Sequence, residues 1–323
     1  MRYFIVLLAL SLVSCAIPAE EQDSAIYHPR TDTLSIIKTG MLLRAQLPSA
    51  YIPNRPLDIW LPPSYHEGKR HNVLYMYDGQ MLFDAKSTWN GQEWRVDEIV
   101  DSLIDKQLMM PTIVVGLHNG GNRRSFEYFP QRPASNLTAV FADSLFRNIA
   151  NAHELDSTHA VNSDNYLKYL VEEVKPYIDR SFRVNKSRVH TAIMGSSMGG
   201  LMSMYAIGEY PDIFGTALCL STHWPGGFSQ NEQIPQVFAT YLKEHITPDR
   251  VGKIYFDYGT KTLDSMYGPI QKSMDEVLTD NLFTFNENWI TLEFEGAAHN
   301  EQSWANRLHL PLIYAFGRNS AFH

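Results

Sequence analysis

The sequence predicts an α/β fold in which helices cover both faces of a mostly parallel, doubly wound sheet. Short, nearly continuous apolar segments alternate with segments whose apolar residues recur at helical spacing. Such alternation is typical of parallel strands joined by crossover helices. We expect strands at residues 57–61, 73–77, 113–117, 190–194, 216–220, 253–258 and 289–294, and helices at 93–105, 163–179, 200–210, 266–281 and 302–316.

The clearest of the expected helices is the segment 163–179. Tyr166, Leu170 and Val174 recur there at helical spacing, and Ser163 stands where a capping residue is favoured. Pro176 is expected to kink this helix or to end it early, because proline removes a backbone donor and clashes with the preceding turn.

Length and composition predict one folded domain, from residue 34 to residue 323. The chain has 323 residues, of which 44% are hydrophobic and 12% aromatic, so it can bury a large core. The formal net charge of -8 argues against nucleic acid as a partner. Cys219 lies in an apolar run and is expected to be a buried thiol without a disulfide partner.

The N-terminus is typical of an export signal. Arg2 precedes an apolar run over residues 3–13 that is shorter than a membrane-spanning helix. The stretch LVSC ending at Cys15 resembles a bacterial lipobox, so we expect a signal peptide at 1–14, a lipid on Cys15 and a polar tether at 15–33. The prediction is an exported bacterial lipoprotein, anchored to a membrane and exposed to the periplasm or the cell surface. The alternative is an ordinary secretory signal that happens to contain a cysteine.

The pentapeptide GSSMG at 195–199 fits the nucleophile-elbow pattern Gly-x-Ser-x-Gly. It stands between an expected strand and an expected helix, which is the context that the elbow requires. The turn forces its serine into an unfavourable backbone conformation, and a Cβ at Gly195 or Gly199 would collide with the neighbouring strand or helix. Ser197 is therefore the candidate nucleophile, and an ordinary glycine-rich turn is the alternative.

Candidates for the acid and the base follow Ser197 in the chain order of an α/β-hydrolase. His299 lies just after the last expected strand, in a loop of small residues; a surface histidine is the alternative. Asp264 follows the strand at 253–258 across a short turn, where the acid is expected. Asp257 competes for this role, but it lies inside the strand pattern, where its carboxylate is expected to form local hydrogen bonds. We therefore expect a triad of Ser197, Asp264 and His299.

The oxyanion of an acyl-transfer reaction requires amide donors. Met198 follows the nucleophile and is expected to supply one amide. The second is expected from Gly79 or Gln80, in the loop after the strand at 73–77. Asp78, in the same loop, is expected to form the turn.

Five segments resemble the esterase D and enterochelin-esterase-like family of esterases, which includes feruloyl and acetylxylan esterases and S-formylglutathione hydrolase. They are VLYMYDGQMLFD (73–84), IVVGLHNGGNRRSFEYFP (113–130), MGSSMGGLMSMYAIGEYPDIFGTALCLSTHW (194–224), YFDYGTKTLDSMY (255–267) and EGAAHNEQSW (295–304). The resemblance covers the chain from about residue 56 to residue 316. It implies an α/β-hydrolase fold and the hydrolysis of carboxylic esters, but its motifs are not specific to one substrate.

The long connection 118–161 is expected to be an insertion on the substrate side, because connections of this length are usually functional lids or disordered loops. Arginine suits a carboxylate or a sugar hydroxyl, and an aromatic ring suits a sugar or phenolic face. Solvated arginines and a packed tryptophan are the alternatives. The candidate substrate contacts are Arg123, Arg124, Tyr128, His223 and Trp224.

The predicted function is a serine carboxylesterase that hydrolyses small or carbohydrate-linked carboxylic esters through an acyl-enzyme. No metal or cofactor is expected, because the sequence has no His-Glu-x-x-His motif, paired-cysteine spacing or glycine-rich nucleotide loop. The nearest alternative is an acyltransferase that uses the same triad, with an alcohol in place of water. A second alternative is a non-catalytic binding lipoprotein of the same fold.

Overall fold

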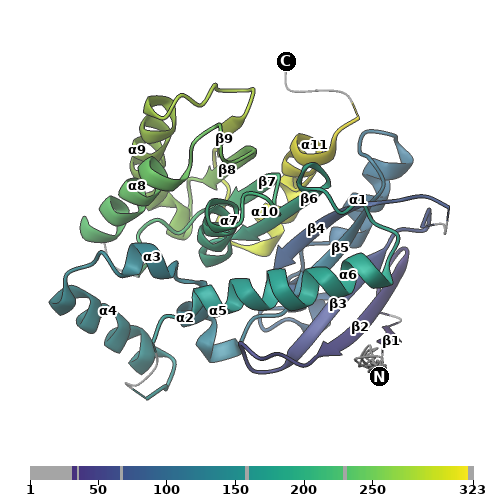
Figure 1. Cartoon of the computed structure of the whole chain (residues 1–323), viewed down its shortest axis with the longest axis horizontal. Helices are drawn as coiled ribbons and strands as arrows, with labels where there is room; N and C mark the ends of the chain where they lie inside the picture. Colours follow the sequence, from purple (N-terminus) through teal and green to yellow (C-terminus); the bar gives the residue numbers. More distant parts are fainter. Residues whose placement is uncertain (1–30, 35, 66–67, 157–159, 228–230, 319–323) are drawn as a thin grey trace, which may run out of the picture.

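The computed structural model describes residues 31–34, 36–65, 68–156, 160–227 and 231–318. Within these ranges, nine strands form one sheet in the order β1-β2-β3-β5-β4-β6-β7-β8-β9 (Figure 1). The pairs β1-β2, β2-β3 and β3-β5 are antiparallel, and every later pair in this order is parallel. The predicted mostly parallel sheet is confirmed.

The secondary structure alternates between strands and helices along most of the chain. The strands are β1 (Thr31–Leu34), β2 (Met41–Leu47), β3 (Arg55–Leu61), β4 (Asn72–Tyr77), β5 (Thr112–Leu117), β6 (Thr191–Ser196), β7 (Thr216–Leu220), β8 (Lys253–Gly259) and β9 (Trp289–Phe294). The α-helices are α1 (Val96–Asp105), α2 (Arg124–Tyr128), α3 (Gln131–Ala134), α4 (Ala139–Ala152), α5 (Ser163–Lys168), α6 (Lys175–Ser181), α7 (Met198–Glu209), α8 (Gln233–His245), α9 (Tyr267–Asp280), α10 (Glu301–Arg307) and α11 (His309–Phe316). Other helical turns are η1 (Gly79–Met81), η2 (Ala85–Ser87), η3 (Gly121–Arg123), η4 (Tyr169–Val174), η5 (Arg188–His190) and η6 (Thr262–Met266).

All seven expected strands are present as β3 to β9, but β1 and β2 were not predicted. Residues 31–33, expected to end the tether, pair with β2, so they belong to the sheet. In β2 the side chains of Leu42, Ala45 and Leu47 are buried while those between them are half-buried or exposed. This burial does not follow a strict period of two, which is why the strand gives no clear alternating pattern.

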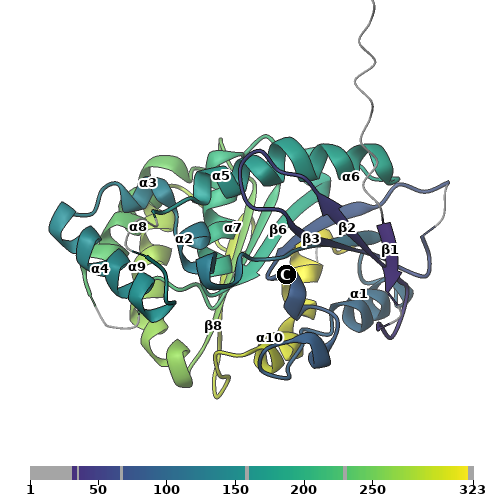
Figure 2. The same cartoon turned by 90° about the horizontal axis from the view of Figure 1, so that it is seen from below.

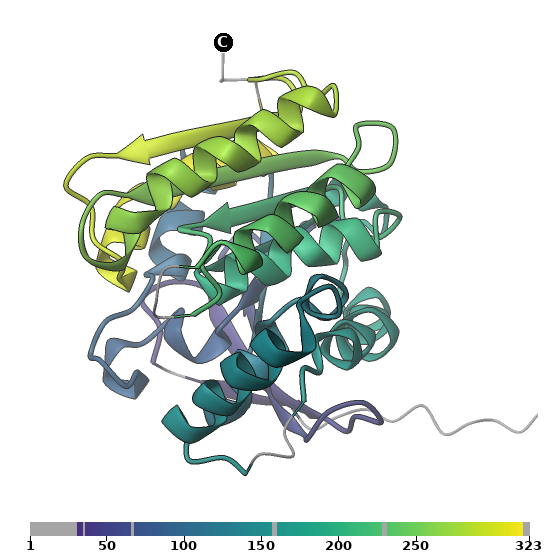
Figure 3. The ribbon, with the colours of Figure 1, turned by 90° about the vertical axis from the view of Figure 1, so that its left-hand side faces the viewer.

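Most buried apolar side chains pack into two cores, one on each face of the sheet. A third, small cluster holds Phe126, Ile149 and Ala150. In β4, Val73, Tyr75 and Tyr77 enter one core, while Leu74 and Met76 enter the other, as the alternation of side chains along a strand requires. The first core is covered by α5 to α9 and the second by α1, α10 and α11 (Figure 2). Within the first layer, α8 and α9 lie side by side (Figure 3). The predicted doubly wound architecture is confirmed.

The expected helix at 163–179 forms α5, η4 and α6 in succession and extends to Ser181. The segment η4 is a π-helix, and its wider turn comes just before Pro176, which occupies the first turn of α6. The helix therefore continues past the proline instead of ending early. Ser163 is not its cap, because its Oγ accepts a hydrogen bond from the amide of Gln131 in α3 (2.8 Å).

The connection 118–161, which we expected to be an insertion on the substrate side, is only partly exposed. Its α2 packs inside the protein, where Phe126, Glu127 and Tyr128 are buried, and Glu127 forms a two-pronged ion pair with Arg55 at 2.7 and 2.8 Å. In contrast, α4 lies at the outer edge of the molecule (Figures 1 and 3) and most of its side chains are exposed or half-buried. The first part of the connection is thus a packed element and not a lid.

The predicted signal peptide (1–14), Cys15 and most of the predicted tether lie outside the described residues. In the part of the chain that the structure describes, no helix has both the length and the apolar character needed to cross a membrane. Cys219 is a free thiol and is fully buried in the first core, as expected.

Candidate active site

The turn between β6 and α7 holds Ser197 in a strained backbone conformation. Ser197 has φ 57° and ψ -120°, a region that residues with a Cβ rarely occupy. Its N–H donates to the carbonyl of Leu220 (2.9 Å), and its own carbonyl accepts from the amide of His223 (3.2 Å). These bonds to the end of β7 and the loop after it hold the sharp turn that brings Ser197 to the wall of a cavity.

The two glycines of the elbow are required to different degrees. A Cβ on Gly195 would lie 2.7 Å from the carbonyl carbon of Gly199, which is closer than any real contact of this kind. A Cβ on Gly199 would lie 3.3 Å from the Cβ of Tyr77 in β4. The expected collision is therefore severe at Gly195 and mild at Gly199.

The cavity has a volume of about 480 Å³ and lies at the carboxyl ends of the parallel strands. Ser197, which follows β6, and His299, which follows β9, both line it. This edge is where open α/β sheets bind their ligands, because the loops that follow successive strands meet there. Charged side chains of Asp78, Arg124 and Glu301 also line the cavity. Further lining side chains are aromatic or carry amides, among them Trp89, Trp94, Trp304, Asn90, Gln92 and Asn119.

The loop 89–94 is a part of this cavity that our sequence reasoning missed. Trp89 is 85% exposed although it lines the cavity, and Asn90 donates a hydrogen bond from Nδ2 to Glu301 Oε2 (2.7 Å). The helix expected at 93–105 begins only at Val96, so Glu93 and Trp94 belong to this loop. The unusual composition of WNGQEW, with two tryptophans in a short polar loop, is the only signal that could have identified it.

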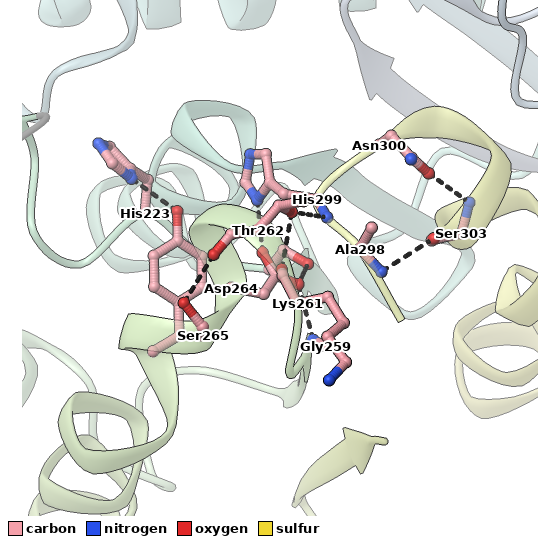
Figure 4. Close-up of polar contacts among 12 residues, drawn as sticks. His223, Gly259, Lys261, Thr262, Asp264, Ser265, Ala298, His299, Asn300 and Ser303 are labelled. Atoms are coloured by element: carbon pink, nitrogen blue, oxygen red, sulfur yellow. Dashed lines mark hydrogen bonds and ion pairs between the residues drawn. The ribbon is translucent and has the colours of Figure 1, made fainter. Parts of the chain in front are cut away.

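The structure brings His299 and Asp264 together (Figure 4). Nδ1 of His299 lies 2.5 Å from Oδ1 of Asp264, whose side chain is buried. Oδ2 of Asp264 accepts hydrogen bonds from Ser221 Oγ and from the amide of Gly259, each at 2.6 Å. Burial alone would raise the pKa of Asp264, but the hydrogen bonds and the nearby imidazole outweigh burial and lower that pKa below its ordinary value. Asp264 is therefore held as a carboxylate that accepts the Nδ1 proton of His299.

Asp257 does not meet His299 in the structure. Its buried carboxylate accepts hydrogen bonds from Arg307 Nη2 (2.8 Å) and Tyr255 Oη (3.0 Å), and from the amide of Ser221 (3.3 Å). The bond from Tyr255, two residues away, is the kind of local contact that was expected, but Arg307 comes from α10 and is not local.

Ser221, immediately after β7, is a second residue that sequence reasoning missed. Besides donating to Asp264, its Oγ accepts hydrogen bonds from Trp304 Nε1 and Arg307 Nη2, each at 2.9 Å. The Trp304 ring also packs edge-on against His299, with the ring centroids 4.9 Å apart. Ser221 therefore links the acid to the helix that follows the histidine. A lone serine at a strand end carries no sequence signal for such a role.

The residues expected to supply oxyanion donors lie at two helix starts. Met198 begins α7, and Gly79 and Gln80 begin η1 after β4. The first amides of a helix have no acceptor within it. Of these three residues, Gln80 lines the cavity, whereas Met198 and Gly79 are not part of its lining. Asp78 forms the turn, as predicted, but its carboxylate also makes a two-pronged ion pair with Arg124 at 2.7 Å for each contact.

Of the five expected substrate contacts, only Arg124 lines the cavity. Arg123 lines a separate cavity beside Pro53. The expectation is wrong for Tyr128, His223 and Trp224, because their side chains are buried and their polar atoms bind other protein groups.

Each of the three buried side chains has a defined partner. Tyr128 Oη accepts from the amide of Asp78 (3.3 Å), and Trp224 Nε1 donates to Gln271 Oε1 (2.7 Å). Nδ1 of His223 lies 2.7 Å from the hydroxyl of Tyr267. Burial lowers the pKa of His223 to about 3, so this imidazole is neutral at physiological pH.

Within the described ranges, no group of three or more His, Cys, Asp and Glu side chains is placed to hold a metal ion.

Comparisons with known proteins identify the family. A family model described as "Putative esterase" matches residues 49–309. The uncharacterized protein YbbA of Bacillus subtilis (strain 168) is 23% identical over 273 residues, which cover 82% of this chain and 94% of that protein. The resemblance to esterases that the sequence segments indicated is thereby confirmed.

Several solved structures share the fold. A ferulic acid esterase from Anaeromyces mucronatus is 18% identical with a TM-score of 0.56, covering 91% of this chain and 93% of that one. The enterochelin esterase from Shigella flexneri is 17% identical with a TM-score of 0.60, covering 84% of this chain and 57% of that one. An IroE-like serine hydrolase from Shewanella oneidensis is 18% identical with a TM-score of 0.59, covering 84% and 78%. The chain belongs to the Putative esterase family, and it is an esterase, a hydrolase of carboxylic esters, with an α/β-hydrolase fold.

Proposed function

We propose that the protein is a serine carboxylesterase whose catalytic triad is Ser197, Asp264 and His299. The observation that supports this most strongly is the pairing of His299 with the buried carboxylate of Asp264, in a cavity that Ser197 also lines. Because Asp264 accepts the Nδ1 proton, Nε2 of His299 is left with a free lone pair that can take a proton.

The reaction then follows from the proton positions. His299 Nε2 accepts the Ser197 hydroxyl proton as Oγ attacks the ester carbonyl, and Asp264 stabilises the imidazolium that forms. The bond to the alcohol oxygen breaks, His299 returns the proton to the leaving alcohol, and an acyl-enzyme remains on Ser197. Water attacks this ester in the same way, which releases the acid and restores the serine.

The oxyanion of each tetrahedral intermediate is assigned to the amide of Met198 and an amide of Gly79 or Gln80. Donors of this kind are each worth about 100- to 1,000-fold in rate, because they are oriented before charge develops. Gln80 lines the cavity, which favours the loop after β4 as the second source.

The proposed substrates are small or carbohydrate-linked carboxylic esters. Tryptophan and amide side chains both line the cavity. Tryptophan rings can stack on the faces of sugar or phenolic rings, and amide groups can form hydrogen bonds with hydroxyl groups. Similar solved structures include the Anaeromyces mucronatus ferulic acid esterase in complex with ferulic acid. They also include the enterobactin esterase FES from Shigella flexneri in the presence of enterobactin. A panel of acetyl, feruloyl and longer acyl esters on sugars and simple alcohols identifies the preferred class. Product analysis with an added sugar alcohol separates hydrolysis from acyl transfer.

A fluorophosphonate probe, which reacts with activated serines, tests the nucleophile. We expect the wild type to be labelled and Ser197→Ala to be unlabelled. The matched control is Ser196→Ala, because Ser196 is the preceding residue and also lines the cavity. Labelling that persists in Ser197→Ala contradicts the proposal.

We further propose that the protein is exported and anchored to a membrane through a lipid on Cys15, facing the periplasm or the cell surface. The support is the sequence alone: the basic start, the short apolar run and the LVSC stretch that resembles a lipobox. Palmitate labelling of the wild type and of Cys15→Ser tests it.

A further inference from the structure

Asp78 has a left-handed backbone conformation at the start of the turn after β4. Its φ and ψ are 58° and 46°, and its side chain does not cap η1. This conformation is unfavourable for a residue with a Cβ, although aspartate can adopt it when its side chain is hydrogen-bonded. The contacts that hold Asp78 come from another part of the chain.

Four hydrogen bonds tie Asp78 to the segment 119–128. Arg124 donates from Nε to Oδ1 and from Nη2 to Oδ2, each at 2.7 Å, and Asn119 donates from Nδ2 to Oδ1 at 2.6 Å. The amide of Asp78 donates to Tyr128 Oη at 3.3 Å. A two-pronged arginine–carboxylate pair fixes orientation as well as distance, so Arg124 determines how the carboxylate is turned.

The residues 78–80, here called the oxyanion turn, are packed tightly against the end of β5. A Cβ on Gly79 would lie 2.6 Å from the carbonyl carbon of Gly116 and 2.8 Å from Cδ2 of His118. His118 is itself held by Asp58, with Nε2 2.9 Å from Oδ2. The turn has no room to move toward β5, so the directions of its amides depend on the conformation of Asp78.

The carboxylate of Asp78 also lies beside the nucleophile elbow. Its Oδ2 is 3.6 Å from the position that a Cβ on Gly199 would occupy. An unpaired negative charge there would oppose the negative charge that develops on the substrate oxygen. The guanidinium of Arg124, which stays protonated in proteins, neutralises it.

We propose that Arg124 is a positioning residue, which through its ion pair with Asp78 orients the amides of the oxyanion turn and neutralises the carboxylate beside the oxyanion. This inference rests on the proposed function, because it requires an acyl-enzyme reaction at Ser197. It differs from the sequence-based expectation that Arg124 binds a carboxylate or hydroxyl of the substrate. That expectation predicts an effect on KM that is largest for anionic esters.

The test compares kcat and KM of Arg124→Gln on p-nitrophenyl acetate, which is neutral, and on mono-p-nitrophenyl succinate, which is anionic. We expect kcat to fall on both esters by about 30- to 1,000-fold, up to the loss that one oxyanion donor accounts for. We expect KM to change little on either ester. The rate of labelling by a neutral fluorophosphonate should fall in parallel with kcat, because phosphonylation also develops negative charge in the oxyanion site.

Two further variants separate orientation from charge. Arg124→Lys keeps the charge but cannot bind both carboxylate oxygens in the same way, so its kcat should fall between those of the wild type and Arg124→Gln. It also serves as the test if Arg124→Gln does not fold. Asp78→Asn combined with Arg124→Gln should be at least as active as Arg124→Gln alone, because the uncompensated charge is gone.

Arg132→Gln is the matched control. Arg132 makes a two-pronged ion pair with Glu209, at 2.9 and 2.7 Å, that is remote from the cavity lining. The kcat of Arg132→Gln should equal that of the wild type.

Three outcomes overturn the inference: a change confined to KM of the anionic ester, an Arg124→Lys variant with wild-type kcat, or a double variant that is less active than Arg124→Gln alone. Different kinetic results would contradict the proposed function itself. In that case the wild type hydrolyses neither ester, or Ser197→Ala hydrolyses them as fast as the wild type does.

Discussion

Ser221 donates a hydrogen bond from Oγ to Oδ2 of Asp264 at 2.6 Å, and this contact leaves Oδ1 of Asp264 to face His299. The hydroxyl has a single hydrogen, which it gives to the carboxylate, while its oxygen accepts from Trp304 and Arg307. The direction of every bond around Ser221 is thereby determined. Ser221 holds the acid in the orientation that suits the histidine.

Ser221→Ala should lower kcat by about 10-fold or more and should also destabilise the fold. The substitution removes one donor from Asp264 and leaves the buried Trp304 Nε1 without its acceptor, at about 1–3 kcal/mol for an unsatisfied group. Arg307 Nη2 loses one of its two acceptors and keeps Asp257. Steady-state kinetics and thermal unfolding check both effects. Ser221→Thr keeps the hydroxyl and is expected to recover part of kcat, and a Ser221→Ala enzyme with wild-type kcat would contradict the role.

Ser197→Ala and His299→Ala should each lower kcat by roughly four to six orders of magnitude with the fold intact, because both residues act in one covalent step. The double variant should be scarcely slower than either single variant. Kinetics on p-nitrophenyl acetate, with circular dichroism as the folding control, measure this. Activity within tenfold of the wild type in either single variant rules out the triad.

Replacing the buried Asp264 and Asp257 by asparagine should change kcat/KM to very different extents. Asp264→Asn should cost about four orders of magnitude in kcat/KM, because an amide favours the wrong tautomer of His299. Asp257→Asn should cost far less activity, because Asp257 binds Arg307 and Tyr255 and does not meet the histidine. Its main effect should be on stability, since it leaves the buried Arg307 without a counter-charge. The opposite ranking of the two variants in kcat/KM would assign the acid to Asp257.

Asp275 in α9 should make the fold less stable as the pH rises. Its carboxyl accepts from Thr291 Oγ1 (2.7 Å) and Gln271 Nε2 (2.9 Å), but burial outweighs these bonds and raises its pKa to about 6, from an ordinary value of 3.8. A raised pKa favours the protonated form in the folded state. The stabilisation is therefore complete below the unfolded-state pKa and is lost as the pH rises through about 6.

Asp275→Asn should thus be more stable than the wild type at pH 8, by at most about 3 kcal/mol, and the advantage should shrink as the pH falls from about 6 to about 4. Chemical denaturation at several pH values measures the difference. Asp275→Ala, measured over the same pH range, is the second variant: it also removes the carboxyl, so its stability should show the same loss of pH dependence as Asp275→Asn. A constant difference across this pH range would contradict the assignment.

Cys15→Ser should abolish palmitate labelling and release the protein from the membrane fraction, because a lipidated N-terminal cysteine carries the two or more acyl chains that stable anchoring requires. Membrane fractionation of both proteins checks the second effect. Unchanged labelling in the variant would show that the lipobox assignment is wrong.

The pattern of apolar residues and glycines along the sequence was enough to predict the strands of the parallel sheet and the nucleophile elbow. Strands such as β4 and β6 are buried on both faces. In the sequence they therefore appear as short, nearly continuous apolar runs, which are typical of parallel strands. The elbow depends on glycines two residues from Ser197 on either side, and such steric requirements act within a few residues of the chain. The chain order of Asp264 and His299 after the serine follows from the order of the strands that carry them.

Only the tertiary structure could reveal β2, the role of Ser221 and the ion pair of Asp78 with Arg124. The two strands at this edge pair antiparallel, and the irregular burial of β2 leaves no period to detect. Ser221 meets Asp264 across 43 residues, and Asp78 meets Arg124 across 46. Hydrogen bonds of this kind depend on distances that the packed sheet imposes, and no spacing along the chain encodes them. The same reason explains why Tyr128 and Trp224, which look like substrate contacts in the sequence, are instead packed inside the protein.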